Sequence, residues 1–161
     1  MCIRDRCKRW KVSLNPGKGE YVFGEKNDSR AILMKPLTGM NMSGKAVKEF
    51  CTNQGLLLSN VHVIVDDIDL PLGKLRIRPK GGDGCHRGME SIINQNRDIN
   101  FPRIRFGIAV GSNLRPSEQY VLNDFKKSDQ NLADEMIVRA ADAAELIFEY
   151  GLNKAMNKYN A

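Results

Sequence analysis

The chain has 161 residues, of which 42% are hydrophobic and 27% are charged, which favours a single globular domain with a real core. No run approaches the ~18 consecutive apolar residues that a membrane helix needs. The net charge of +6 suits a polyanionic partner such as RNA, although basic proteins without one are common.

The N-terminus and the cysteines indicate the compartment. Residues 1–10 are charged and have no apolar core, so they do not resemble a signal peptide. The 4 cysteines show no C-x-x-C spacing and the chain has 2 histidines, so we expect free thiols and no zinc site. We therefore expect a cytoplasmic protein, with an organelle as the alternative.

The first third of the chain predicts short strands and one helix. Strands are expected at 11–14, 21–23 and 31–34, with a turn at 15–19. Ser43 is a plausible N-cap for a helix from about Gly44 to Gln54.

A run of β-branched residues, Val61–Val65, predicts a buried strand that delivers Asp66 to the edge of a sheet. Functional residues of open α/β sheets often lie at such carboxyl ends, but a lone aspartate there is equally a turn residue. Asp67 and Asp69 lie close by and raise the question of Mg²⁺. We expect no metal, because no matching ligand pattern occurs elsewhere.

Residues 74–78 alternate strictly, as a half-buried strand does, and place Lys74, Arg76 and Arg78 on one face. The glycine-rich residues 81–88 could hold an anion before a helix, or could be a flexible loop. A helix is expected at 86–96, with His86 at its start.

The C-terminal part predicts a strand at 103–110, a loop at 111–116 and a short helix or lid at 118–125. The longest helix begins at Ser128 and stops at Gly151, and a short basic helix follows at 152–159. Strands that alternate with helices predict an α/β fold. We expect one domain over 1–161, a mixed β-sheet flanked by helices in three layers.

Three polar residues are candidates for chemistry. Asn41 precedes a helix start, where unpaired N–H groups suit an ester or phosphate, but it could simply cap the turn. His86 could titrate at a site or could cap its helix. His62 would lie about 13 Å from Asp66 along one strand face, beyond hydrogen-bond reach, so we assign it no catalytic role.

Several segments together resemble the bacterial-type peptidyl-tRNA hydrolase family, over about Ile32 to Asn160. These segments match in order and spacing: Lys35–Gly44 with its Met-Asn pair, Asp66–Gly73, His86–Gly88, Phe101–Ile108 and Ala155–Tyr159. The combination is far more specific than any one motif.

The resemblance implies a monomeric enzyme, without metal or cofactor, that cleaves the ester between a peptide and the 3′ end of tRNA. It implies that a histidine near the N-terminus activates water and that Asp66 orients this histidine. It gives Asn41 a role in positioning the carbonyl and the water. The further site residues that it implies are Met40, Gly84, His86 and Arg87 for the substrate, and Arg78 and Arg105 for tRNA phosphate.

The chain departs from the family pattern in two places. No histidine precedes His62, and residues 1–6 match nothing in the family, so we expect a chain that lacks its N-terminal segment and residues 1–10 that are unrelated or disordered. Arg87 stands where asparagine is usual, adding a fixed charge and removing an acceptor. A non-catalytic RNA-binding protein on the same scaffold is the alternative.

Overall fold

The computed structural model describes residues 2–26, 31–112, 114–115 and 117–160. The chain divides into two compact units. The first is built mainly from Ile3–His62 and Pro79–Pro102, and the second mainly from Val63–Arg78 and Arg103–Ala161.

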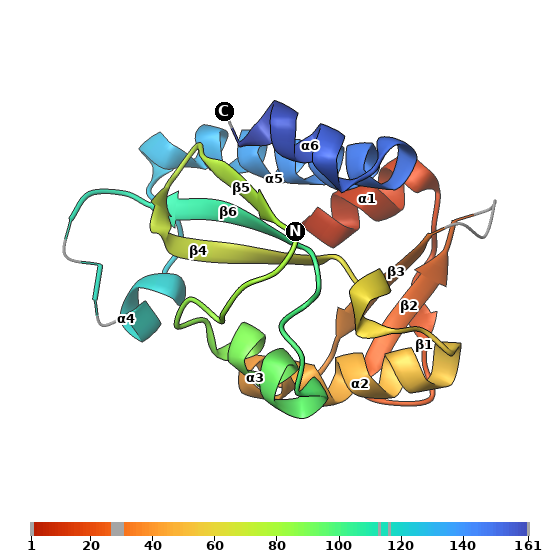
Figure 1. Cartoon of the computed structure of the whole chain (residues 1–161). Coiled ribbons are helices and arrows are strands. Elements are labelled where there is room, and N and C mark those ends of the chain that lie inside the picture. The colour runs from red at the N-terminus through yellow and green to blue at the C-terminus, as the bar shows by residue number, and fades with distance from the viewer. Residues whose placement is uncertain (1, 27–30, 113, 116, 161) are drawn as a thin grey trace. The chain divides into compact units, whose positions relative to one another are not determined.

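The first unit contains a small antiparallel sheet and three α-helices (Figure 1). The sheet has the order β1-β2-β3, from β1 (Asn15–Pro16), β2 (Tyr21–Glu25) and β3 (Ile32–Pro36). The helical elements are α1 (Cys2–Trp10), η1 (Met40–Met42), α2 (Ser43–Gln54), η2 (Leu58–Asn60) and α3 (Arg87–Asn96). An aromatic cluster forms part of the core of this unit. The rings of Tyr21 and Phe50 meet edge to face, with their centroids 5.4 Å apart.

Helix α2 packs directly on α3, and one glycine allows the close approach. A Cβ on Gly44 would lie 2.0 Å from the carbonyl oxygen of Ser91. The amide of Gly44 also donates to Ser91 Oγ at 3.0 Å. Ala46, Val47 and Phe50 are buried on α2, as its sequence pattern predicts.

The second unit contains a mixed sheet with the order β4-β6-β5. Strand β4 (Val63–Pro71) runs parallel to β6 (Arg103–Ala109), whereas β5 (Leu75–Arg78) is antiparallel to β6. Its helices are α4 (Ser117–Val121), α5 (Lys127–Tyr150) and α6 (Leu152–Tyr159).

Figure 1 shows α5 and α6 lying together over one face of this sheet. Their contact buries one apolar core: Leu75, Ile77, Ile104, Met136, Ala140, Ala143, Ile147 and Ala155. Leu75 and Ile77 point into this core while Arg78 is exposed, which confirms the alternation predicted for residues 74–78. At C-cap Gly151, with φ 85°, helix α5 ends as expected.

The predicted α/β class is confirmed, with the strands arranged in two three-stranded sheets. Other expectations were wrong in detail. Residues 11–14 form no strand, and Cys2–Trp10 is helical rather than disordered. Ser43 is the first residue of α2 and donates to Met40 O at 2.9 Å, instead of accepting as an N-cap. Within the described residues, no helix has both the length and the apolar character that crossing a membrane requires.

Candidate functional site

Met40 and Asn41 lie in η1, the single turn that leads into α2. Met40 is 58% exposed. A Cβ on Gly88 would lie 2.7 Å from Met40 Sδ, so this side chain rests against the start of α3. The predicted Met-Asn segment and the predicted glycine-rich turn therefore meet within the first unit.

His86 is the N-cap of α3 through its side chain. Its Nδ1 accepts from the amides of Gly88 at 3.1 Å and Met89 at 3.3 Å. An Nδ1 that accepts carries no proton, so in the neutral ring the proton is on Nε2. To act as a base, His86 would have to take a proton on Nδ1 and lose both hydrogen bonds, or first give up the proton on Nε2. His86 is therefore poorly suited to replace a missing general base.

The turn before α3 contains two consecutive residues with left-handed backbone. Gly84 has φ 62° and Cys85 has φ 60°, and both residues are exposed. Glycine adopts this conformation without strain, whereas cysteine does not. The turn is held by Asp83, whose Oδ1 accepts from the amide of Cys85 at 2.6 Å.

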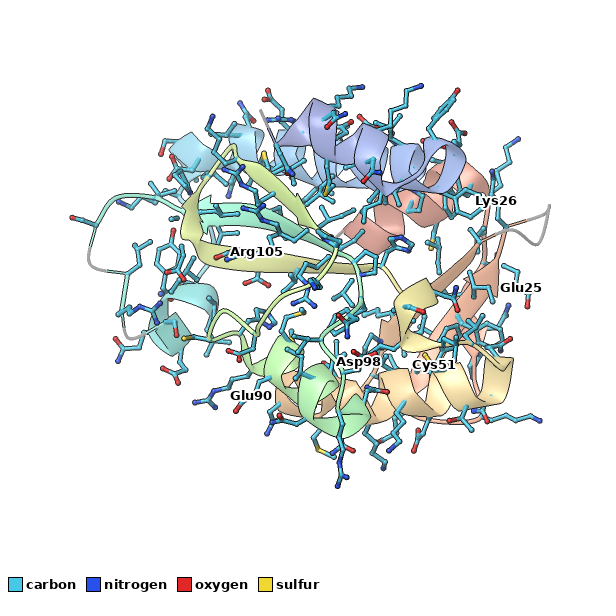
Figure 2. The ribbon with its side chains drawn as sticks, viewed as in Figure 1. Glu25, Lys26, Cys51, Glu90, Asp98 and Arg105 are labelled. Atoms are coloured by element: carbon cyan, nitrogen blue, oxygen red, sulfur yellow. The ribbon has the colours of Figure 1, made fainter. Side chains whose placement is uncertain are left out.

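A polar hollow of about 470 Å³ lies in the first unit. It is lined by Asn41, Arg87, Glu90, Ser91, Asn94 and Gln95. The structure thus brings Asn41 and Arg87 together, while Met40, Gly84 and His86 are outside this lining. Figure 2 labels Glu90 on α3.

Sequence reasoning missed Glu90, Asn94 and Gln95. These residues follow Arg87 at steps of three, seven and eight along α3, which is one stripe of a helix. That spacing was visible in the sequence. The missing information was that η1 borders the same stripe.

Asp66 lies in β4 of the second unit, opposite Phe106 of the parallel strand β6. The prediction that the strand ends at Val65 is wrong, because β4 continues to Pro71. The ladder is irregular between Asp67 and Pro71, however, so Asp66 lies one residue before the point where the regular pairing stops. Gly107 accommodates this irregular segment, because a Cβ there would lie 2.0 Å from Pro71 O.

The two arginines expected to contact tRNA differ in their surroundings. Arg78 ends β5 and is exposed. Arg105, labelled in Figure 2, forms an ion pair with Asp67, and the two side chains are 30% and 6% exposed. Burial, followed by the nearby positive charge of Arg105, lowers the pKa of Arg103. No sequence pattern indicated that Asp67 would be a buried partner for Arg105.

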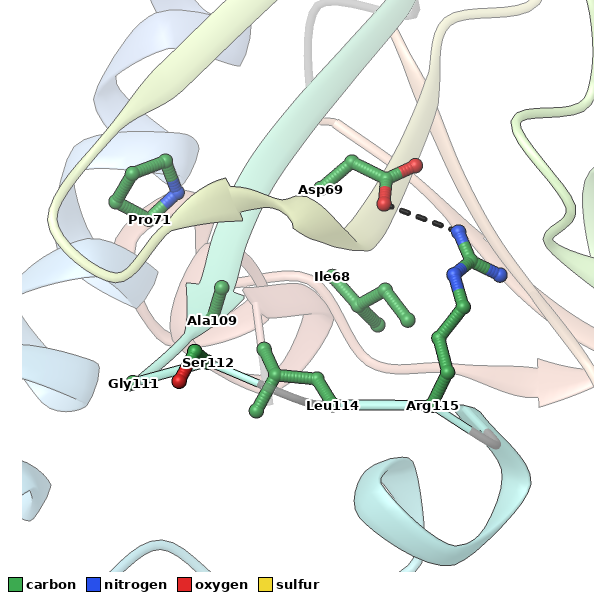
Figure 3. A pocket seen from close by; sticks show the side chains of 8 residues that line it. All are labelled: Ile68, Asp69, Pro71, Ala109, Gly111, Ser112, Leu114 and Arg115. Atoms are coloured by element: carbon green, nitrogen blue, oxygen red, sulfur yellow. Dashed lines mark hydrogen bonds and ion pairs between the residues drawn. The ribbon is translucent and has the colours of Figure 1, made fainter.

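A second hollow, of about 420 Å³, lies where β4 and β6 end (Figure 3). Its lining is Ile68, Asp69, Pro71, Ala109, Gly111, Ser112, Leu114 and Arg115. Arg115 donates to Asp69 at 3.1 Å across its rim, with both side chains more than half exposed. The position agrees with the rule that sites gather at the carboxyl ends of parallel strands.

The peptidyl-tRNA hydrolase family model matches residues 1–161. The chain belongs to this family. It is 38% identical to a peptidyl-tRNA hydrolase of Geobacillus kaustophilus (strain HTA426), over 98% of this chain and 86% of that protein. It is 41% identical to one of Thermoanaerobacter sp. (strain X514), over 99% of this chain and 87% of that protein.

A crystal structure of peptidyl-tRNA hydrolase from Acinetobacter baumannii has the same fold, with a TM-score of 0.90 and 26% identity. The match covers 99% of this chain and 83% of that one. The predicted fold and the predicted peptidyl-tRNA hydrolase function are thereby confirmed at the level of the family.

The first residues of the chain belong to the family match. The family match begins at residue 1, so the expectation that the first ten residues are unrelated to the family was wrong. The match likewise gives no support to the expected loss of an N-terminal segment. The roles assigned to individual residues stay predictions.

Proposed function

We propose that this protein hydrolyses the ester that joins a peptide to the 3′ end of tRNA, with Asp66 and Asn41 acting at the ester. Membership of the peptidyl-tRNA hydrolase family is the observation that carries the proposal. In the reaction, the oxygen of water bonds to the ester carbonyl carbon and the bond to the tRNA 3′ oxygen breaks. One proton leaves the water, and one reaches the departing 3′ oxygen.

Asn41 is proposed to donate its amide N–H to the carbonyl oxygen, where negative charge develops. Its place in the polar hollow with Arg87 and Glu90 supports this role. Arg87 is proposed to contact a phosphate near the reacting end, since a guanidinium offers several N–H donors to phosphate oxygens. Met40 and His86 are proposed to border the path of the peptide.

Asp66 is proposed to activate the attacking water directly, since neither His62 nor His86 is assigned the role of base; the alternative is that Asp66 orients one of these two imidazoles. The two routes differ in their pH dependence. A carboxylate base would leave the rate level across neutral pH, whereas an imidazole base would add a rise over the range in which the imidazole loses its proton. A pH profile of single-turnover hydrolysis distinguishes them.

The decisive experiment is single-turnover cleavage of a peptidyl-tRNA, beside a titration of tRNA binding. We expect cleavage by the unaltered chain and a loss of about 10²-fold or more in Asp66→Ala and Asn41→Asp, with tRNA binding retained. Asp134→Asn is the matched control, because Asp134 is an exposed carboxylate on α5. Binding without cleavage in the unaltered chain would contradict the proposal and favour a non-catalytic RNA-binding protein.

We further propose that the protein acts as a monomer, without metal or cofactor, in the cytoplasm or an organelle where translation occurs. This part rests on the family resemblance. Light scattering during size exclusion measures the mass of the particle. Activity that disappears after dialysis against EDTA and returns with Mg²⁺ would contradict the metal-free reaction.

A further inference from the structure

Asp67 is a buried carboxylate with two polar contacts inside the second unit. Its side chain is 6% exposed and forms an ion pair with Arg105 on β6. Its Oδ1 also accepts from the amide of Asp69 at 2.9 Å. Because burying an unpaired charge is costly, these two contacts explain how a carboxylate is tolerated there.

The same carboxylate spans the irregular part of β4. The regular pairing of β4 with β6 stops at Asp67 and resumes at Pro71. The bond from Asp69 closes a tight turn at this break, while Arg105 ties the turn to the neighbouring strand. Asp67 therefore fixes the backbone that immediately follows Asp66.

The ion pair with Asp67 also decides which N–H donors of Arg105 stay available to a phosphate. The side chain of Arg105 is 30% exposed, so part of the guanidinium reaches solvent. A guanidinium has five N–H donors, and one carboxylate occupies at most two of them. Arg105 can therefore hold Asp67 and still offer donors to a phosphate, although its charge is already balanced.

We propose that Asp67 is a positioning residue that orients Arg105 for a tRNA phosphate, neutralises its charge, and holds the strand that carries Asp66. The proposal rests on the proposed function, because it takes tRNA as the ligand, and it uses the role in tRNA phosphate binding that the family resemblance implies for Arg105. Asp67 acts through Arg105 and the main chain, because successive residues of a strand point to opposite faces and Asp66 and Asp67 are neighbours.

The test uses Asp67→Asn in the full chain, because asparagine keeps the shape and the acceptor for the Asp69 amide and removes the charge. Arg105 then carries an unbalanced charge, so deacylated tRNA should bind about fivefold more tightly at 0.1 M salt, with a salt slope steeper by about one counterion. Cleavage should change in the opposite sense, with kcat lower by about tenfold or more, because the groups are misplaced. Unchanged tRNA affinity and salt slope would overturn the proposal.

The double variant Asp67→Asn/Arg105→Gln supplies a second readout. It removes both charges, so the salt slope should return to that of the unaltered chain, and a steeper slope in the double variant would overturn the proposal. Circular dichroism on all variants checks the fold. If Asp67→Asn alone is unfolded, the same two binding measurements on Arg105→Gln and on the double variant decide. The salt slope of Arg105→Gln should then be lower than that of the double variant by about one counterion, because Asp67 keeps its charge there, and equal slopes would overturn the proposal.

Arg105→Gln alone separates this proposal from the one on which it rests. Unaltered tRNA binding in Arg105→Gln would remove Arg105 from the phosphate contacts and overturn this proposal, whereas the proposed hydrolysis stands or falls by the cleavage assay of the unaltered chain. Weaker binding in Arg105→Gln together with no effect of Asp67→Asn would contradict the role of Asp67 alone.

Discussion

His86 is attached to the first turn of α3 through one ring nitrogen, which accepts from two main-chain amides. Removing a side-chain N-cap typically costs about 1 kcal/mol of stability. We therefore expect His86→Ala to lower the free energy of unfolding in urea by about this amount. His86→Asn should recover most of it, since the asparagine oxygen is a good N-cap acceptor. Equal losses in the two variants would show that the cap is not what the imidazole contributes.

Other single residues show how far sequence reasoning reaches. Asn41 and Arg87 were selected from separate motifs, and the structure places both in one hollow. The Asp67–Arg105 ion pair was missed, because a carboxylate in an acidic turn looks exposed in sequence. Which of several neighbouring acids becomes buried depends on the partner that the adjacent strand supplies, and that is a long-range property.

At the scale of elements, the packing of α2 on α3 depends on the absence of a side chain at Gly44. A Cβ there would lie 2.0 Å from Ser91 O, which is main chain and cannot move aside alone. Gly44→Ala should therefore cost about 1–3 kcal/mol in the free energy of unfolding, the usual range for overpacking. Gly82→Ala is the control, because nothing lies within 4 Å of its Cβ position. A loss in Gly44→Ala no larger than that in Gly82→Ala would contradict close packing of the two helices.

The edge of the second sheet is covered by a side chain near the chain's end. Asn160 Oδ1 accepts from the amide of Ile77 at 2.7 Å, and its Nδ2 donates to Ile77 O at 3.0 Å. This amide thus satisfies the outward N–H and C=O of Ile77 in β5, as a neighbouring strand would. Asn160→Ala should cost about 1–3 kcal/mol in thermal or urea unfolding, because two main-chain groups lose their partners. The exposed Asn157, changed to alanine, should have little effect, and equal losses would contradict this role.

Helices were easier to predict than strands in this chain, and the reason is physical. The stripe of α5 and the stop at Gly151 are local signals, and the observed helix Lys127–Tyr150 agrees with them. Strand β4 was expected to stop at Val65, because acids and a proline follow. Its extension to Pro71 depends on pairing with β6, some forty residues away, and on Gly107 leaving room for the irregular turn. Separation into two sheets is likewise fixed by pairing partners, which composition does not reveal.

At the scale of the whole molecule, the net charge of +6 should attract tRNA from a distance, and particular arginines should then set the bound position. Arg78 is exposed at the end of β5, whereas Arg105 is balanced by Asp67. Arg78→Gln should therefore weaken tRNA binding and lower the slope of log K against log salt by about one unit.

Fluorescence anisotropy with deacylated tRNA at several salt concentrations measures this slope. Lys18→Gln is the matched control, because it removes one exposed positive charge outside the residues proposed to meet tRNA. A local phosphate contact requires a clearly larger effect at Arg78 than at Lys18. Equal effects at the two positions would mean that only total charge matters, and Arg78 would then have no specific place in the tRNA interface.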